Sequence, residues 1–444
     1  MVERKHYMDT IFAMSSGAGV AGVAVVRMSG PSVRDGLETM TGSVPEPRVA
    51  TYGSIRSAGG TRLDRGIVLY FPAPRSFTGE DCAELHVHGG RAVIESVLAS
   101  LSELPGFRSA EPGEFTRRAF ENGKMDLTAV EGLADLIAAE TEIQRRMALQ
   151  QSSGALSERY ERWRSTLLRA RAMIEADFDF ADEEDVPGSV ADSIWPDLET
   201  LAQEIERHLA GARAGEIIRD GYRVVILGAP NAGKSSLINA LAKRDIAIVS
   251  DERGTTRDLL EVHLDIAGYP VVLHDTAGLR DAAGAVESEG IRRALAAAER
   301  ADLVLLLEDL NDTGQPVSPP ADNVPVLRIG TKADLAGHAG RAEYDAVISV
   351  KKDDGLAGLI GLLEQRVKAA AGGAVSTLPN RQRHREYLSA CLGALRAALE
   401  NDSDPLELRS ELLRQAGDAL GRLTGRIDVE DLLDLIFGEF CIGK

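Results

Sequence analysis

Gly228–Ser235, "GAPNAGKS", is the stretch that decides the fold of the central part of this 444-residue chain. The apolar run before it, Arg223–Leu227, predicts a β-strand, and the segment after it, Lys234–Leu241, predicts a helix. A strand, a glycine-rich loop of this pattern and a helix form a phosphate-binding loop, because backbone amides and the helix dipole attract phosphate oxygens. In such a loop the Lys234 ammonium reaches the terminal phosphates and the Ser235 hydroxyl coordinates Mg²⁺.

Two further motifs follow in the order that a GTP-binding domain requires. "DTAG" (275–278) ends a predicted strand, where Asp275 can hold the water shell of the metal and Gly278 can sense a γ-phosphate. "TKAD" (331–334) ends another, and the Asp334 carboxylate can accept both hydrogen-bond donors on the guanine edge. Three such motifs in this order identify the bound nucleotide as GTP.

Short apolar strands alternate with helices throughout this region. The predicted strands after the first are Val271–His274, Leu303–Leu307, Val326–Ile329 and Ala346–Ser349. Alternating strands and helices are typical of a parallel α/β sheet. The sequence therefore predicts a P-loop GTPase domain of the Ras-like kind.

The residue that orients the attacking water in Ras-like proteins is absent, because Leu279 follows the DTAG motif where a Gln is expected. Asn231 and the stretch "SDERGTTRD" (250–258) supply oxygens near the phosphates. A monovalent cation held there would neutralise developing charge, with Thr256 as the second Mg²⁺ ligand and Thr255 as a ligand of the monovalent ion. A purely structural turn role for Asn231 is equally compatible with the sequence.

The bulk composition describes a globular, acidic protein. Its formal net charge is −19, from 50 basic and 69 acidic residues, which argues against a protein that binds nucleic acid mainly through phosphates. Three cysteines do not make a disulfide framework, and no apolar stretch is long enough to span a bilayer. The N-terminus "MVERKHYMDT" lacks the pattern of a signal peptide, so a cytoplasmic location is expected.

The rest of the chain shows two other kinds of sequence pattern. Residues 1–123 contain strand-like runs such as Val23–Val26 and Gly66–Phe71, separated by turn clusters. From Asp126 the spacing is helical, with a capping-box pattern at Thr128 and Glu131, and it is helical again after residue 376. We therefore expect segments 1–123, 124–219, 220–376 and 377–444, in which one helical domain is interrupted by the GTPase domain.

Three short motifs need separate treatment. "GAGVAG" (17–22) matches a dinucleotide fingerprint, but a strand rather than a helix follows it, so we reject that interpretation. "RQRHR" (381–385) is either a local nucleic-acid contact or a solvated helix start. His86 and His88 look like half a metal site, but no further ligand cluster accompanies them, so we assign them structural roles.

The chain ends in "FCIGK" (440–444), and its cysteine is not a prenylation site because Lys444 is the last residue and no polybasic run precedes it. Together with "DTIFAMSSGAGVAGVAVVRMSG" (9–30), "SFTGEDCAELHVHGG" (76–90), "PGEFTRRAFENGKMDL" (112–127) and the GTPase motifs, this ending resembles the MnmE (TrmE) family of tRNA modification GTPases. The resemblance covers essentially the whole chain.

The resemblance implies a multidomain protein with an N-terminal α/β dimerisation domain, a central helical domain from two chain segments and an inserted GTPase domain. It implies binding of GTP, Mg²⁺, K⁺ and a tetrahydrofolate, either the 5-formyl or the methylene form. With an FAD- and NADH-using partner of the MnmG (GidA) kind, such proteins add a carboxymethylaminomethyl-type group to carbon 5 of the wobble uridine of certain tRNAs. It also implies a homodimer, a heterotetramer or larger complex with the partner, and no membrane association.

The resemblance assigns site residues by position. The nucleotide contacts are Asn231, Ala232, Gly233, Lys234, Ser235, Ser236, Ser250, Thr255, Thr256, Asp275, Thr276, Ala277, Gly278, Thr331, Lys332 and Asp334. The Mg²⁺ ligands are Ser235 and Thr256, and the potassium ligands are Asn231, Ser250, Glu252 and Thr255. The catalytic residues are Lys234, Thr256 and Glu287, although Glu287 could instead cap a helix. The tetrahydrofolate residues are Arg27, Glu84, Lys124 and Lys444.

Some positions depart from the family pattern. Thr331 stands where Asn is usual in the guanine motif, and Val350 stands where a small residue is usual in the last guanine loop. The sequence leaves open whether Cys441 acts chemically or only positions Lys444. The strongest rival function is a GTP-driven switch in ribosome assembly without modification chemistry, although such proteins usually append a basic RNA-binding module. A scaffold with a decayed GTPase is disfavoured because Lys234, Ser235 and Asp275 are present.

Overall fold

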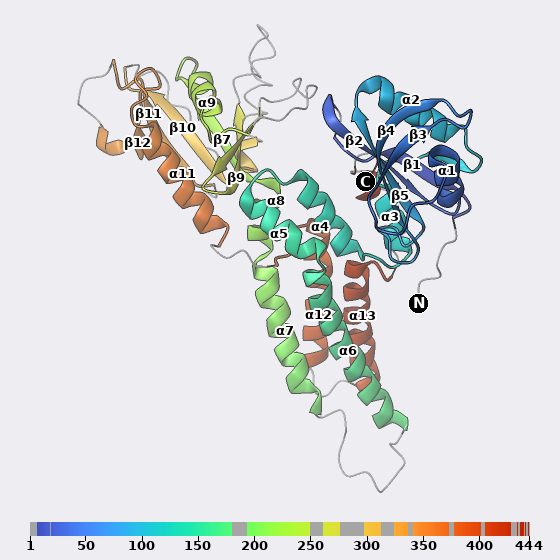
Figure 1. Cartoon of the computed structure of the whole chain (residues 1–444). Helices are drawn as coiled ribbons and strands as arrows, with labels where there is room; N and C mark the ends of the chain where they lie inside the picture. The colour runs from blue at the N-terminus through green and yellow to red at the C-terminus, as the bar shows by residue number, and fades with distance from the viewer. Residues whose placement is uncertain are drawn as a thin grey trace, which may run out of the picture. The chain divides into compact units, whose positions relative to one another are not determined.

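The computed structural model describes most of the chain (Figure 1). The described residues are 7–17, 19–179, 193–248, 261–275, 297–311, 324–335, 341–372, 377–400, 405–427, 433, 436–438, 440 and 443. They form two compact units. Unit 1 comprises Met1–Ala134, Gln151–Asp192 and Asn401–Lys444, and unit 2 comprises Asp135–Gln150 and Ser193–Glu400. Each unit combines one sheet with helices, and the boundaries of the four expected segments remain predictions.

Unit 1 is built on a six-stranded sheet with the strand order β3-β4-β5-β2-β1-β6. The strands are β1 (Thr10–Met14), β2 (Ala21–Ser29), β3 (Thr51–Arg56), β4 (Arg62–Phe71), β5 (Cys82–Gly89) and β6 (Phe107–Ser109). Neighbouring strands are antiparallel except for β1 and β6, which pair in parallel. The predicted strand runs at 23–26 and 66–71 lie within β2 and β4, which confirms both.

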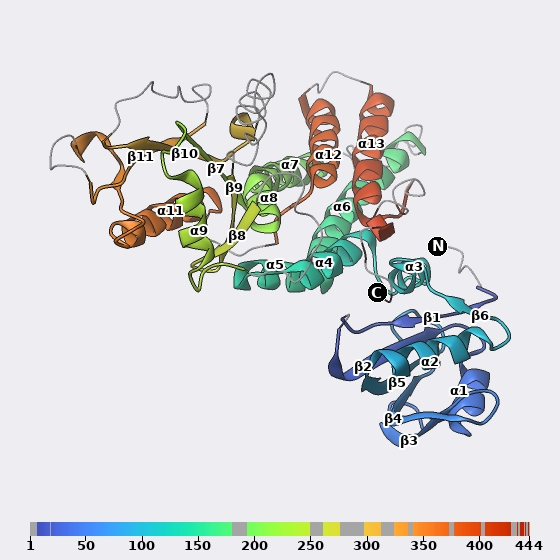
Figure 2. The same ribbon diagram turned by 90° about the horizontal axis from the view of Figure 1, so that it is seen from above.

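The two faces of this sheet differ because strand side chains alternate. One face carries Val26, Leu85 and Val68, which are buried in register against α1 (Val33–Thr41) and α2 (Arg91–Ser102), the two helices that Figure 2 shows beside the sheet. The other face carries Arg27, Glu84, His86, Ile67 and Tyr52, which also lie in register. Tyr52 is 64% exposed and Ile67 39%, so this face presents apolar and charged side chains together.

A buried ionic network holds α3 (Glu114–Glu121) against the strands. The Arg118 side chain is fully buried, and its guanidinium lies 2.9 Å from Asp9, 3.1 Å from Glu114 and 3.2 Å from Glu80. Arg108 also pairs with Glu114. Removing one partner of such a network leaves an uncompensated buried charge, which typically costs about 3–5 kcal/mol.

We therefore expect Arg118→Met to lower the free energy of unfolding of unit 1 by about 3 kcal/mol at pH 7. The measurement is the denaturant dependence of amide hydrogen exchange in β1 and α3 of the full chain. Arg117→Met, a change of a partly exposed arginine on the same helix, is the matched control. Equal effects of the two substitutions would contradict the importance of the network.

The same network predicts how stability depends on pH. Burial alone would raise the pKa of Glu114, but the hydrogen bond from Arg108 and the charge of Arg118 lower that pKa below its ordinary value. A carboxyl group whose pKa is lower in the folded than in the unfolded state stabilises the fold above its unfolded pKa. This contribution should be complete above about pH 4.5 and disappear as the pH falls further, and it should be smaller in Arg118→Met.

The helices of unit 1 outside the sheet domain include α6 (Ala155–Asp179) and α13 (Leu406–Thr424), which pack against each other. The first helix of this region, α4 (Leu127–Ala138), corrects the predicted capping box. Thr128 lies inside the helix, and the Asp126 carboxylate instead accepts the Ala129 amide at 3.0 Å. Asp126 is the better cap because its ionised oxygen precedes the first turn.

The C-terminal end of the chain belongs to the same unit as the N-terminal sheet. Phe437 and Phe440 are buried in a cluster with Leu127 and Val130. The Gly443 carbonyl accepts the Ser15 hydroxyl at 2.9 Å, directly after β1. A Cβ on Gly443 would lie 2.0 Å from the Met14 carbonyl oxygen, and the residue has φ +98°, so only glycine fits there.

Unit 2 contains the predicted α/β sheet, with the strand order β12-β11-β10-β7-β9-β8. The strands are β7 (Tyr222–Gly228), β8 (Glu261–Ile266), β9 (Tyr269–Asp275), β10 (Leu303–Asp309), β11 (Val326–Thr331) and β12 (Ala346–Val347). All five predicted strands are confirmed within two residues, and all pair in parallel. The antiparallel edge strand β8 was not predicted.

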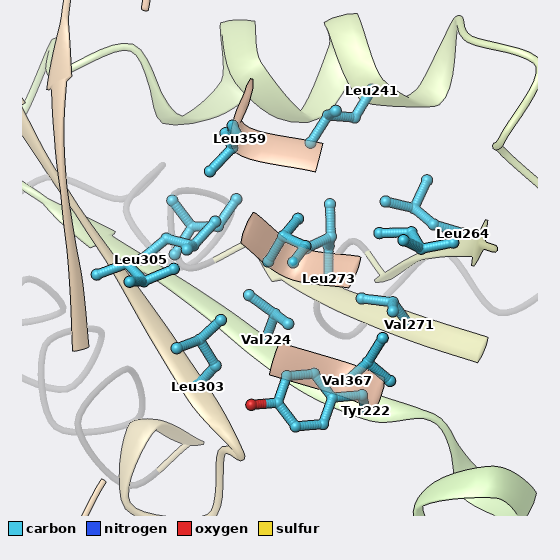
Figure 3. Packing of buried hydrophobic residues seen from close by; sticks show 14 of the residues in the cluster. Tyr222, Val224, Leu241, Leu264, Val271, Leu273, Leu303, Leu305, Leu359 and Val367 are labelled. Atoms are coloured by element: carbon cyan, nitrogen blue, oxygen red, sulfur yellow. The ribbon is translucent and has the colours of Figure 1, made fainter. Parts of the chain in front are cut away.

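Both faces of this sheet are buried, as is usual for parallel sheets. Val224 and Leu305 pack toward α9 (Lys234–Ala242) and α11 (Leu356–Ala370), where Leu241, Leu359 and Leu273 meet them in the core that Figure 3 shows. Val225, Leu227 and Leu306 alternate with these residues and pack on the opposite face with Ala298. This continuous apolar pattern explains why the strands could be predicted.

In the part of unit 2 that the structure describes there are also α7 (Trp195–Ala210), α8 (Ala212–Asp220), α12 (Gln382–Glu400), most of α5 (Glu142–Ser152) and the end of α4. α7 packs against α12. The assignment of α5 to the GTPase sheet was not predicted, because its apolar spacing resembles that of the neighbouring helices.

Candidate functional site

The candidate phosphate-binding loop connects β7 to α9. Asn231 and Gly233 have φ values of +64° and +94°, so the loop turns sharply before the helix begins at Lys234. The Lys234 side chain is buried, and its ammonium donates to the carbonyls of Gly228 and Ala229, both at 2.8 Å. The start of α9 and the Lys234 ammonium thus belong to one loop, and the amides of a helix start together with a cation suit a chain of phosphates.

The ends of the central strands converge at this edge of the sheet. β7 ends at Gly228, and Asp275, at the end of β9, lies in register with Ile226 of β7. β10 and β11 flank the other side of β7 and end in Asp309 and Thr331. In α/β proteins, ligands bind at the carboxyl ends of the parallel strands, at the point where the chain changes from one side of the first strand to the other.

Thr331 lies where its hydroxyl can tie the guanine motif to the phosphate loop. Its Oγ1 is 2.8 Å from the Ala232 carbonyl oxygen and 3.1 Å from that of Glu308. The side chain is buried. Thr can therefore supply the bridging hydrogen bond at the position where Asn is usual.

Asp334 has a partner that sequence reasoning missed. The Ser349 hydroxyl donates to Asp334 Oδ1 at 2.8 Å. This hydrogen bond, with the charges of Lys351 and Lys352, lowers the pKa of Asp334 below its ordinary value. Ser349 thus orients an ionised Asp334, and the serine of "SVKK" was the available signal for the last guanine loop.

Lys332 lies between these residues with a φ of +57°, and its ammonium donates to Asp309 Oδ2 at 2.7 Å. This contact keeps the stem of the side chain beside the strand ends. Asn231, Ala232, Gly233, Lys234, Ser235 and Ser236 are all described. They form the loop after β7 and the first turn of α9, and the structure brings them together with Thr331, at the end of β11, and with Asp334 at one edge of the sheet.

Several predicted residues lie outside the described part of the chain. These are Ser250, Glu252, Thr255, Thr256, Thr276, Ala277, Gly278, Glu287, Cys441 and Lys444, together with the side chain of Asp275. The predicted roles of these residues in binding Mg²⁺, potassium and folate, and in hydrolysis, stay predictions.

The predicted tetrahydrofolate residues of unit 1 fall into two contacts. The Arg27 guanidinium contacts Glu84 Oε1 at 2.9 Å and lies over the rings of Phe77 and Phe115, 5.2 Å and 5.9 Å from their centroids. Lys124 donates to the Pro74 carbonyl at 3.0 Å, and its stem lies beside Gly79 of the same loop. The loop of residues 74–79 therefore contacts both Arg27, through Phe77, and Lys124.

Glu84 is an ionised acceptor on the partly exposed sheet face. Burial alone would raise its pKa, but the hydrogen bond from His86 and the charge of Arg27 lower it. His86 Nε2 lies 3.2 Å from Glu84 Oε2. A carboxylate fixed in this way can accept N–H donors of a ring such as a pterin, so the residues present fit a folate.

The other motifs have structural partners. His88 pairs with Asp64 at 2.9 Å, and among the described residues no group of His, Cys, Asp and Glu could hold a metal ion. In "RQRHR", His384 is buried, Arg381 pairs with Asp135 at 2.8 Å and Arg385 with Glu216 at 2.9 Å. The motif therefore lies at the start of α12, as one alternative predicted, but His384 and Arg381 are buried or paired rather than solvated. The strand β2 after "GAGVAG" supports the rejection of a dinucleotide site.

Comparison with known proteins gives matches along the whole chain. Residues 127–441 match the family described as "MnmE helical domain", and residues 10–124 match "GTP-binding protein TrmE N-terminus". A protein of Brucella anthropi named "tRNA modification GTPase MnmE" is 54% identical over 446 residues, covering 100% of both chains. A protein of Rhizobium etli with the same name is 56% identical over 439 residues, covering 98% of this chain and 99% of the relative.

The structure adds one observation about membranes. None of the helices in the described ranges is both long enough and apolar enough to cross a bilayer.

Proposed function

The chain belongs to the MnmE (TrmE) family of tRNA modification GTPases, and from this premise we propose that it couples GTP hydrolysis to modification of carbon 5 of the wobble uridine in certain tRNAs. The observation that supports this most directly is the phosphate loop, in which Lys234 and the start of α9 face the strand ends that carry Asp334 and Thr331. The full-length match to relatives of the same name supports the tRNA as substrate.

We propose that unit 1 binds a tetrahydrofolate, which is the source of the one-carbon unit. The ionised Glu84 and the loop that carries Phe77 would hold the ring, with Lys124 nearby and Lys444 contributing from the chain end. The donor is a 5-formyl or methylene tetrahydrofolate, and an FAD- and NADH-using partner of the MnmG kind supplies the redox chemistry. The product would carry an aminomethyl-type group such as carboxymethylaminomethyl.

We also propose that the protein acts as a cytoplasmic homodimer within a larger complex with that partner. The partly exposed sheet face with Tyr52 and Ile67 is suited to a second copy because it presents apolar side chains beside charged ones. Mg²⁺ would be held by Ser235 and Thr256. Potassium would be held by Asn231, Ser250, Glu252 and Thr255, where its charge would assist hydrolysis in place of the missing Gln.

The experiment that tests the function is mass spectrometry of tRNA nucleosides from cells with and without the gene. Deletion should remove the 5-substituted wobble uridines, and the intact gene should restore them. Unchanged nucleosides would contradict the proposal and would favour a GTPase switch in ribosome assembly.

The potassium proposal predicts that GTP turnover by the full chain is roughly tenfold or more faster in potassium than in sodium buffer of equal ionic strength, because a positioned charge is worth at least one hydrogen-bond donor in the transition state. Asn231→Ala should abolish the difference. Equal turnover in the two buffers would show that no selective site exists.

Gly443 tests how the chain end contributes to the folate site. Gly443→Ala adds a Cβ that would lie 2.0 Å from the Met14 carbonyl, so the end of the chain must move. Met14 is the residue after Ala13, which pairs with Arg27. We expect at least a roughly tenfold loss in affinity for 5-formyltetrahydrofolate, measured by calorimetry. Gly438→Ala, where a Cβ meets nothing within 4 Å, is the matched control and should bind like the wild type. Equal affinities of all three proteins would contradict a role of the tail.

A further inference from the structure

The segment Asp135–Gln150 has an unusual place in the chain. It contains the end of α4, a short loop and most of α5, and it belongs to the GTPase-containing unit 2. The residues immediately before and after it, Ala134 and Gln151, belong to unit 1. This segment is therefore joined covalently to unit 1 at both of its ends.

At one end of the segment, Asp135 contacts both of the chain segments that connect the GTPase sheet to the rest of the protein. Asp135 Oδ1 accepts Arg219 Nε at 3.3 Å and Arg381 Nη2 at 2.8 Å, and its Oδ2 accepts Asn380 Nδ2 at 2.9 Å. Arg219 precedes β7, where the chain enters the sheet, and Asn380 and Arg381 precede α12, after the chain has left it. Asn380 is fully buried. The Asp135 carboxylate therefore contacts the chain both where it enters the sheet and after it has left it.

The other end of the segment holds the turn of the β8–β9 hairpin. Glu140 Oε2 lies 2.8 Å from His263 Nδ1 of β8. The Ile143 amide donates to the Gly268 carbonyl at 3.4 Å, and the Ile143 side chain packs beside this glycine, whose φ of +86° makes the turn. Met147 is buried in the same core as Leu264 of β8, and Figure 2 shows α5 beside this strand.

Gln144 connects the two ends. Its Oε1 accepts the amides of Glu140 and Thr141, both at 3.0 Å, and its Nε2 donates to the Arg219 carbonyl at 3.1 Å. The junction at Asp135 and the hairpin contact at Glu140 are thus parts of one hydrogen-bonded, closely packed element. Such an element transmits a displacement because its packing resists gradual deformation.

The hairpin is the chain that links two nucleotide motifs. β8 begins three residues after "GTTRD" (254–258), and β9 ends at Asp275, the first residue of "DTAG". A shift of either motif between the GTP- and GDP-bound states therefore reaches the hairpin directly.

We propose that Asp135–Gln150 is the coupling segment through which the nucleotide state of the GTPase domain is communicated to the rest of the protein. Asp135, Glu140 and Ile143 are positioning residues that act through the hairpin and the domain junction. The consequence for tRNA modification rests on the proposed function, whereas the coupling itself does not.

The first test is hydrogen–deuterium exchange of the full chain with GDP and with a non-hydrolysable GTP analogue. Amides of residues 135–150 should exchange at different rates in the two states. Glu140→Ala combined with Ile143→Ala should remove most of that difference, while nucleotide affinity stays within about twofold. Identical exchange of this segment in both states of the wild type would overturn the proposal.

The second test separates turnover from modification. Asp135→Asn keeps the shape of the side chain and removes its charge. Like the double variant, it should leave GTP turnover within about twofold of the wild type. The amount of modified wobble uridine should fall at least roughly fivefold, the smallest usual size of an allosteric coupling. The controls are Glu142→Gln and Leu149→Ala on the exposed side of α5, which should match the wild type.

The outcomes of the two tests distinguish the possible failures. Normal modification in Asp135→Asn and in the double variant, or a fall in turnover as large as the fall in modification, would overturn the coupling role. If wild-type cells lack the modified nucleosides, the proposed function fails, and the exchange experiment still decides whether the segment senses the nucleotide.

Discussion

Lys234→Ala should lower GTP turnover by a factor of roughly 100 to 1000, the usual effect of removing one preorganised charged donor from a transition state. The Lys234 ammonium is held at the mouth of the loop by the Gly228 and Ala229 carbonyls, both at 2.8 Å. We propose that from there it reaches the terminal phosphates, where negative charge increases during hydrolysis. Phosphate release from the full chain with saturating GTP measures the effect.

The matched control is Lys243→Ala, at the other end of the same helix, where the side chain is exposed. This variant should turn over GTP like the wild type, and both variants should unfold at the same temperature within a few degrees. Nucleosides from cells that carry Lys234→Ala should lack the 5-substituted wobble uridines. Turnover by Lys234→Ala close to that of the wild type would show that the loop does not serve hydrolysis.

The GTPase fold could be predicted because its signals are local. Fully buried parallel strands appear as short apolar runs, and a glycine-rich loop between a strand and a helix has few other uses. The strand β8, "EVHLDI", was missed because the predicted strands were continuous apolar runs, whereas this edge strand alternates polar and apolar residues.

The parts that could not be predicted depend on contacts between distant residues. Nothing in the spacing of α5 shows that Ile143 and Met147 pack on the GTPase sheet rather than on other helices. Ser349 was passed over because only the folded chain brings its hydroxyl to Asp334. The capping box at Thr128 was wrong because Asp126, two residues earlier, caps the helix through the Ala129 amide, which places Thr128 inside the first turn.

The remaining predictions rest on the resemblance to a family, and the structure shows the surroundings of these residues. The sequence alone suggests that Arg27 is an ordinary surface charge, whereas in the fold its guanidinium lies over the rings of Phe77 and Phe115 and contacts Glu84. Both side chains lie on the sheet face opposite the core, so strand register brings together residues 57 positions apart in sequence.

Asp334→Asn should weaken GTP binding by a factor of roughly 100 and should favour xanthosine triphosphate instead. In the proposed site the ionised carboxylate accepts two donors of guanine, and hydrogen bonds to a charged group contribute about 1.5–3 kcal/mol each. Asn presents an amide donor, which opposes the guanine donors but matches the carbonyl that xanthine carries in place of the exocyclic amine. Competition between the two nucleotides for the full chain measures the change.

Asp354→Asn, the same chemical change at an exposed carboxylate near the same loop, is the control and should keep the preference for GTP. The protonation state of Asp334 also determines how the affinity for GTP depends on pH. Its pKa is lowered by the Ser349 hydrogen bond and nearby lysines, so the binding form persists and affinity should stay constant from pH 8 down to about pH 5. Ser349→Ala removes that hydrogen bond, so the acid loss of affinity should begin at a higher pH than in the wild type. An unchanged nucleotide preference in Asp334→Asn would mean that another group reads the guanine edge.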